Sequence, residues 1–292
     1  MPARWTRAHH LALALSAMAT AACNSGSLTT PGAGNELTGD VGVTIRDEVE
    51  ATVNALTLST SLTPIGTSRT PASTDPCVVS STPTDSDGDG VPDDATYLFT
   101  APPCQFEGWR GGTLELVGQL QIQDPAPASA GFGYDATITN LRSRFTNAAK
   151  DVITDVTRNG SRTLSGSVAG LLLISGLQVT RNFAGKPDAA IDEQWTVNYT
   201  PSTPLQINGP VNSGTLDISG TMNWTRPGNE ALALVVTTPT PLEYDASCTD
   251  TVQRFKNGEL HAAGDFGDNM VGFVRVRWNG CGQEPTIGFG VK

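Results

Sequence analysis

Apolar and polar residues alternate one by one along several stretches of this 292-residue chain. The clearest are GTLELVGQLQIQ (112–123), IDEQWTVNYT (191–200) and GTLDISGTMNW (214–224). Successive side chains of a β-strand point to opposite faces of a sheet, so this period of two predicts half-buried antiparallel strands.

Turn signals separate these runs. Asn-Gly pairs, which favour tight hairpin turns, stand at 159–160, 208–209, 257–258 and 279–280. We count about ten strands between residues 95 and 291. The sequence therefore predicts an all-β fold with a large antiparallel sheet, arranged as a sandwich, a barrel or a half-barrel.

One short helix is predicted ahead of the strands. In TIRDEVEATVNALTL (44–58) apolar residues recur every three or four positions, which is the spacing of one helix face. Thr44 occupies the N-cap position, and acidic residues follow it where the helix dipole favours negative charge. The apolar positions are Ile45, Val49, Val53 and Leu56, and the acidic ones are Asp47, Glu48 and Glu50.

Residues 1–22 have the organisation of an export leader. Arg4 and Arg7 precede the mainly apolar run LALALSAMATAA (11–22), which leads into Cys23. This run is too short to span a bilayer as a stable helix, and it is typical of a cleaved signal peptide.

TAAC (20–23) resembles the bacterial lipobox, whose cysteine becomes the lipidated first residue of the mature protein. By this resemblance Cys23 carries a lipid anchor, although Thr20 replaces the usual leucine. The alternative is ordinary cleavage after ATA (19–21), which leaves Cys23 as a spare thiol. Five cysteines are an odd number, and setting Cys23 aside leaves four that can pair in an oxidising compartment.

The lipobox resemblance also implies a location. Asn24 stands where enterobacterial lipoproteins retained in the inner membrane carry aspartate, so an outer-membrane anchor, facing the periplasm or the cell surface, is implied. We interpret the Gly/Ser/Thr-rich residues 23–40 as a flexible tether and residues 41–292 as a single β-rich domain. Without the leader, 16 basic residues oppose 29 acidic ones, a net charge of −13 that disfavours nucleic acid and anionic headgroups as partners.

The stretch DSDGDGVPDD (85–94) has the spacing of a calcium loop. Its aspartates at positions 1, 3 and 5 and the glycine at position 6 match the first half of an EF-hand loop, and the seventh residue would offer a backbone carbonyl. Thr96 replaces the bidentate glutamate of position twelve.

The stretch is similar instead to the DxDxDGxxD loops of thrombospondin type-3 repeats and related bacterial secreted proteins. This resemblance implies structural Ca²⁺, whereas the alternative is a solvated acidic turn. Carboxylates packed this closely repel one another without a counter-ion, so we expect Ca²⁺ to bind. The expected ligands are Asp85, Asp87, Asp89, Val91, Asp93 and Asp94.

The four remaining cysteines allow three pairings. Cys77 and Cys104 bracket the aspartate-rich stretch, and Cys248 and Cys281 bracket the C-terminal hairpins. We predict the bridges Cys77–Cys104 and Cys248–Cys281, because each closes a local excursion between strands. The calcium loop then lies inside a disulfide-closed segment, 77–104.

Few residues could carry acid–base or nucleophilic catalysis. Without the leader, His261 is the only histidine, and no G-x-S-x-G motif is present. A zinc site with two or three histidines is thereby excluded, whereas a glycosidase-type pair of carboxylates stays open. We expect no enzymatic activity, and we assign Trp195 and Trp224 to the core because they lie on the apolar face of their strands.

Three classes of function fit these observations. The first is a lipid-anchored, non-catalytic interaction or structural module. The second is a carrier of a lipid or other hydrophobic ligand, since a helix followed by a large curved sheet resembles the periplasmic LolA-like carriers, whose helix plugs an apolar concavity. The third is a hydrolase. A filled core would indicate the module, a large apolar cavity the carrier, and converging carboxylates in a deep pocket the hydrolase.

Overall fold

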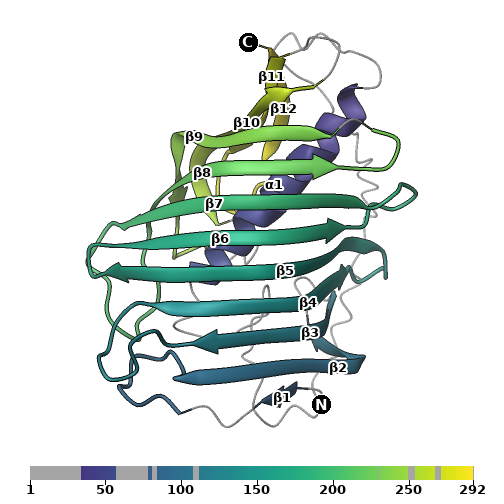
Figure 1. Ribbon diagram of the computed structural model, residues 1–292. Helices are drawn as coiled ribbons and strands as arrows, with labels where there is room; N and C mark the ends of the chain where they lie inside the picture. Colours follow the sequence, from purple (N-terminus) through teal and green to yellow (C-terminus); the bar gives the residue numbers. More distant parts are fainter. Residues whose placement is uncertain are drawn as a thin grey trace, which may run out of the picture.

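The structure of this chain is a computed structural model. It describes seven segments of the chain, and these together contain the helix and all the strands discussed below (Figure 1). The described segments are 34–56, 78–80, 84–107, 112–229, 231–248, 254–266 and 271–291.

Twelve strands form one antiparallel sheet in which every strand pairs with its neighbours in sequence, from β1 to β12. The predicted all-β class is confirmed, with twelve strands in place of about ten, and the sheet is open rather than closed into a barrel (Figure 1). The strands are β1 (Val78–Ser80), β2 (Asp94–Glu107), β3 (Thr113–Gln123), β4 (Tyr134–Thr146), β5 (Val152–Ser167), β6 (Gly170–Arg181), β7 (Ala189–Pro201), β8 (Gly214–Thr225), β9 (Leu232–Tyr244), β10 (Phe255–Asp265), β11 (Val271–Trp278) and β12 (Thr286–Val291).

The alternation along the strands separates a buried face of the sheet from an exposed one. In β7 and β8 buried and exposed residues follow each other almost without interruption. Trp195 and Trp224 lie on the buried face, as predicted, and Trp278 of β11 joins them there. The buried face therefore carries the hydrophobic core, because burying these large aromatic side chains contributes much of its apolar area.

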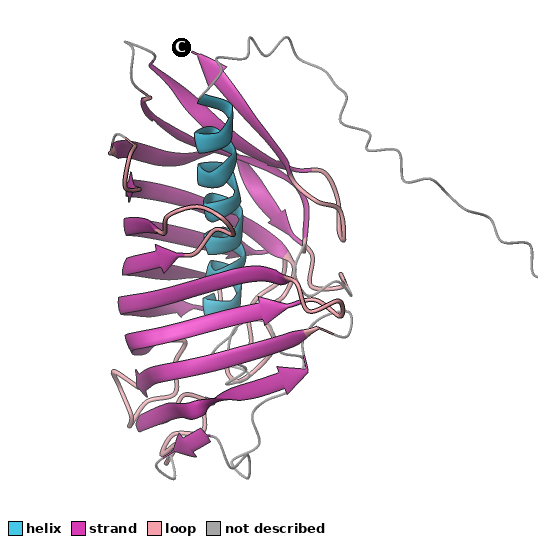
Figure 2. Ribbon diagram, turned by 90° about the vertical axis from the view of Figure 1, so that its right-hand side faces the viewer, coloured by secondary structure: helices cyan, strands magenta, loops and turns pink. Residues whose placement is uncertain are grey.

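Helix α1 (Gly34–Leu56) lies in the hollow of the curved sheet (Figure 2). It packs against β6, β11 and β12, and its apolar face is fully covered. Most of its stability therefore comes from packing on the sheet, since an isolated helix with two internal glycines is marginal in water. The covered side chains are Val41, Ile45, Val49, Val53 and Leu56.

The helix is longer than predicted. It begins at Gly34, so residues 34–40, which we had assigned to the tether, are helical. Thr44 is not the N-cap; it is buried within the helix, and its hydroxyl donates a hydrogen bond to the Asp40 carbonyl at 2.8 Å. The glycines at 39 and 42 concealed this part of the helix, because glycine disfavours helix interiors.

Gly42 has a packing reason to be glycine. A Cβ atom at this position would overlap Cγ2 of Ile287 in β12, whereas one at Gly39 would meet nothing within 4 Å. The missing side chain thus lets α1 approach the last strand closely.

The predicted bridge Cys248–Cys281 is present, with a Cα–Cα distance of 5.8 Å. It links the connection that follows β9 to the connection between β11 and β12. Cys104 on β2 is buried and disulfide-bonded, while its predicted partner Cys77 lies outside the described residues, as does Cys23. The described part of the chain has no helix with the length and apolar character needed to cross a bilayer.

Candidate functional site

The aspartate-rich loop precedes β2 and brings three of its carboxylates together. Oxygens of Asp85, Asp87 and Asp89 all lie within 4.8 Å of one another. Two oxygens bound to one Ca²⁺ at 2.3–2.6 Å can be at most about 5 Å apart, so this spacing matches shared ligation.

The loop curls because its own aspartates accept backbone hydrogen bonds. The Asp85 carboxylate accepts from the amides of Gly88 at 2.8 Å and Gly90 at 3.0 Å. Both glycines have positive φ, 77° and 90°, which other residues rarely adopt. The predicted sharp turn at the sixth position of the loop is therefore present.

The other predicted ligands have different surroundings. The Asp93 carboxylate accepts hydrogen bonds from Ser86 and Thr84, and these bonds lower its pKa. Asp94 starts β2, where its carboxylate accepts a hydrogen bond from the side-chain amide of Gln121 at 3.0 Å. The backbone amide of Val91 donates a hydrogen bond to Asp89 Oδ1 at 2.8 Å, and the Val91 side chain is buried. The structure thus brings the carboxylates of loop positions 1, 3 and 5 (Asp85, Asp87 and Asp89) together, while Asp93 closes the loop through its hydrogen bonds.

A further carboxylate that sequence reasoning missed, Asp124, lies beside the loop. It follows β3 directly, is 9% exposed, and its Oδ2 has no hydrogen-bond partner. Burial raises its pKa, and the negative charges of Asp89, Asp87 and Asp93 raise it further. No local motif could have identified Asp124, since it is far from the loop in sequence.

The donor set around the loop consists of carboxylate oxygens. Hard cations such as Ca²⁺ prefer such ligands, and Ca²⁺ tolerates irregular arrangements of six to eight of them. The residues present therefore fit a calcium ion.

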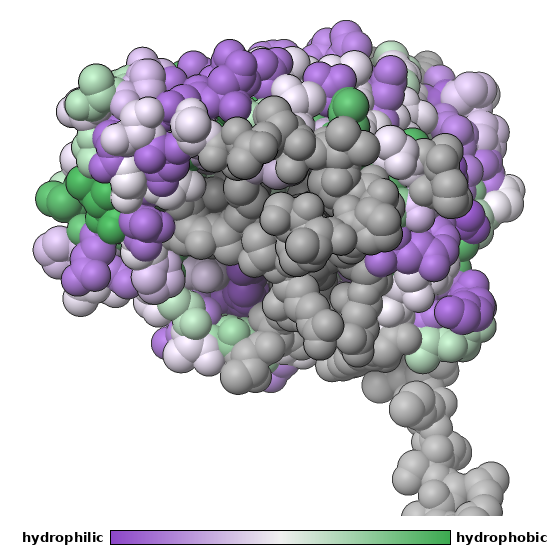
Figure 3. Space-filling view, turned by 90° about the horizontal axis from the view of Figure 1, so that it is seen from below, coloured by the Kyte–Doolittle hydropathy of each residue, from purple (hydrophilic) through white to green (hydrophobic). Residues whose placement is uncertain are grey.

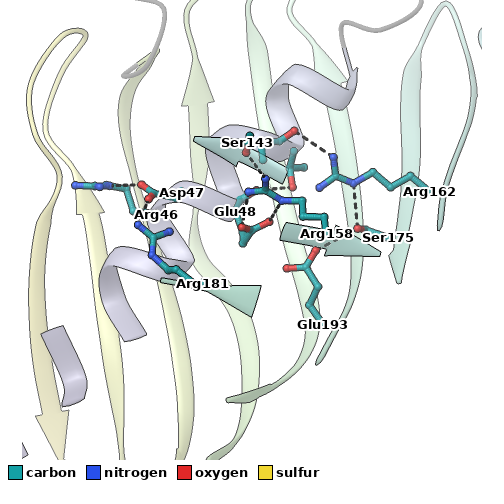
Figure 4. Close-up of polar contacts among 11 residues, drawn as sticks. Arg46, Asp47, Glu48, Ser143, Arg158, Arg162, Ser175, Arg181 and Glu193 are labelled. Carbon is teal, nitrogen blue, oxygen red and sulfur yellow. Dashed lines mark hydrogen bonds and ion pairs between the residues drawn. The ribbon is translucent and has the colours of Figure 1, made fainter. Parts of the chain in front are cut away.

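A second polar cluster lies between α1 and the sheet (Figure 4). We call Glu48, Ser143, Arg158, Arg162, Ser175 and Glu193 the polar layer. Glu48 of α1 and Arg158 of β5 form a two-pronged ion pair, at 2.6 Å and 3.1 Å, and both are buried. Such a pair adds little net stability, but losing one partner costs about 3–5 kcal/mol, so it holds α1 in one position over β5.

The rest of the polar layer continues across β5, β6 and β7. Arg162 Nε donates to the Ser175 hydroxyl at 3.2 Å, and this hydroxyl donates to Glu193 at 3.3 Å. Arg162 also reaches the Ala51 carbonyl of α1 at 3.4 Å. Burial raises the pKa of Glu193 to about 8, and the charge of Glu48 adds to this effect. Two arginines and two glutamates thus share the layer, and below about pH 8 Glu193 holds a proton.

Further ion pairs flank the polar layer along α1. Asp47 pairs with Arg181 of β6 and with Arg46, and these cations lower its pKa although burial opposes them. Asp40 accepts from Arg226 at 2.7 Å and from Lys186 at 2.8 Å. The acidic residues that we expected near the positive end of a short helix are instead mid-helix and contact the sheet.

The polar layer is structural in this arrangement. Glu48 and Glu193 have no exposed surface, so a dissolved substrate has no route to either carboxylate. One sequence signal for the layer existed: Glu193 occupies an apolar-face position in the alternation of IDEQWTVNYT. The basic partners Arg158 and Arg162 likewise fall on buried positions of β5.

His261, which a hydrolase relay would need, lies on β10. Its Nε2 is 2.6 Å from Glu259 Oε1, and its ring stacks on Phe273 at 4.1 Å between centroids. These contacts give the histidine a structural setting.

Comparison of this chain with models of known protein families, with curated proteins and with solved structures finds no match.

Proposed function

We propose that this chain is an exported, lipid-anchored module that is not an enzyme, that serves an interaction or structural role, and whose fold is braced by Ca²⁺. The leader-like residues 1–22 and the lipobox-like TAAC support export and anchoring of Cys23 to the outer membrane. The observation that carries the calcium assignment is the convergence of Asp85, Asp87 and Asp89 within 4.8 Å.

The tightly buried interface between α1 and the sheet favours a module over a carrier. A carrier needs an apolar cavity for its ligand. Here the apolar face of α1 and the three tryptophans Trp195, Trp224 and Trp278 are at most 1% exposed, and ion pairs join α1 to β5 and β6. The described surface seen from below is predominantly hydrophilic, as expected for a solvated module (Figure 3).

Calcium titration tests the metal assignment. We expect heat of binding in calorimetry and, at a hundredfold excess of Ca²⁺ over Kd, about 2.7 kcal/mol of added stability. Asp87→Asn should weaken both effects while keeping the hydrogen bond that Asp87 Oδ1 accepts from the Asp89 amide. Asp192→Asn, on the exposed face of β7, is the matched control and should behave as wild type. Absence of binding to the wild-type protein would refute the calcium site.

Mass spectrometry of the mature protein tests the anchor. We expect an N-terminal Cys23 carrying acyl chains, and we expect Cys23→Ser to release the protein from membranes. An unmodified mature N-terminus at Ala22 would contradict the proposal. If an organic extract of the purified Cys23→Ser variant contained one lipid per protein, the carrier would be favoured instead.

A further inference from the structure

Asp124 is held against the aspartate-rich loop by its own backbone. Its amide lies 3.1 Å from the Pro92 carbonyl and 3.3 Å from that of Asp93, both at the end of the loop. The residue that ends β3 is therefore fixed beside the segment that begins β2.

The Asp124 side chain is incompletely satisfied. Oδ1 accepts a hydrogen bond from the Ala126 amide at 2.8 Å, whereas Oδ2 is buried and has no partner. In the loop, Oδ2 of Asp87 is also buried and without a partner. A buried carboxylate oxygen without a donor or cation is costly, and here two come from separate segments that adjoin each other.

We propose that Asp124 is a fourth carboxylate ligand of the ion held by Asp85, Asp87 and Asp89. This inference rests on the proposed calcium site and extends it beyond the motif. Ca²⁺ requires six to eight oxygens, and the three loop aspartates alone leave this demand unmet. The Asp124 oxygens lie outside the group whose members are within 4.8 Å of one another, so its side chain closes onto the ion on binding and supplies charge and an oxygen that is already desolvated.

Ligation by Asp124 makes the ion a cross-link between two parts of the fold. The connection between β3 and β4, residues 124–133, already touches the loop at a second point, where the Gly131 amide donates to Asp89 Oδ2 at 2.9 Å. Binding of Ca²⁺ thus orders this connection together with the loop.

The test compares Asp124→Asn with Asp192→Asn by calcium calorimetry. Asparagine at 124 keeps the acceptor for the Ala126 amide but loses the charge, so we expect Ca²⁺ affinity to fall by about tenfold or more. Asp192 is exposed on β7, away from the loop, and its variant should bind Ca²⁺ as wild type does. In calcium-free buffer Asp124→Asn should be at least as stable as wild type, because it removes an uncompensated buried charge.

Each outcome separates this inference from the calcium site itself. Wild-type binding with unchanged affinity in Asp124→Asn would overturn the fourth ligand and leave the loop site standing. If the wild-type protein bound no Ca²⁺, both the calcium site and the fourth ligand would be refuted. Hydrogen exchange gives a second readout: Ca²⁺ should slow exchange at residues 125–133 in wild type and fail to do so in Asp124→Asn. Equal protection in both proteins would also overturn the inference.

Discussion

The pKa of Glu50 in α1 is set by burial and by nearby charges of both signs. The residue is 8% exposed; burial and the nearby charge of Asp47 raise its pKa, while Arg254 lowers it, and the result is about 8. Glu193 in the polar layer reaches a similar value. In the unfolded chain both groups would titrate near the ordinary value of 4.5. From about pH 4.5 to 8 the folded state therefore holds protons that the unfolded state has released, and the free energy of unfolding should fall as pH rises.

We expect Glu50→Gln to remove part of this pH dependence. Glutamine resembles the protonated form, so the variant and wild type should be similarly stable at pH 5. At pH 8 and above the variant should be more stable by upward of about 1.4 kcal/mol, which is the value of one pKa unit. Urea unfolding at both pH values measures this. Glu243→Gln, whose side chain is exposed, should show no such difference; an equal gain for Glu50→Gln at pH 5 and pH 8 would contradict the prediction.

Residue-level reasoning identified part of the candidate site. The spacing of Asp85, Asp87 and Asp89 on a short loop was sufficient, because a tight turn brings residues two apart together. Asp124 and the partners of Glu48 could not be found this way. The residues that surround them come close only when strands distant in sequence assemble. In the sequence, a charged residue at a buried position is recognisable only from its place in the alternation of apolar and polar residues.

Among the elements, α1 depends most on close contact with the sheet. Its apolar face packs on β6, β11 and β12, and Glu48, Asp47 and Asp40 pair with basic residues of the strands and their connections. The helix therefore has a defined axial position as well as a buried face.

The two internal glycines of α1, Gly39 and Gly42, offer a matched test of this packing. Gly42→Ala should lower the free energy of unfolding by about 1–3 kcal/mol, because its Cβ would force the helix away from Ile287. Gly39→Ala should raise it by up to about 1 kcal/mol, because alanine favours helix and has open space there. Chemical denaturation of both variants measures the difference. If both substitutions stabilised the protein equally, the close approach of α1 to β12 would be wrong.

At the scale of the whole molecule, the sheet is a meander of sequential neighbours, with β1 and β12 as the outermost of the described strands. Such pairing needs only short connections between consecutive strands. The Cys248–Cys281 bridge adds a longer link across the last hairpins, with a sequence separation of 33 residues.

We expect Cys248→Ser with Cys281→Ser to lower the free energy of unfolding by about 3–4 kcal/mol, the value for closing a loop of this length. Neither cysteine is fully buried, so the loss would report the bridge rather than core packing. Urea unfolding of the double variant beside wild type, both without reductant, provides the measurement. A loss below about 1 kcal/mol would show that the bridge does not constrain the unfolded chain.

The amino-acid sequence by itself indicated the antiparallel strands and the curled aspartate loop, and it predicted the Cys248–Cys281 bridge that the structure shows. These features depend on periodicity and on residues near one another along the chain. Two of the four Asn-Gly turn signals, 159–160 and 257–258, were wrong, because they lie inside β5 and β10. Only the tertiary structure decided that α1 extends back to Gly34 and lies in the hollow of the sheet, that Glu48 meets Arg158, and that Asp124 adjoins the loop. The physical reason is that an alternating pattern reports whether a side chain is buried, whereas the curvature of the assembled sheet decides which distant side chains share that buried space.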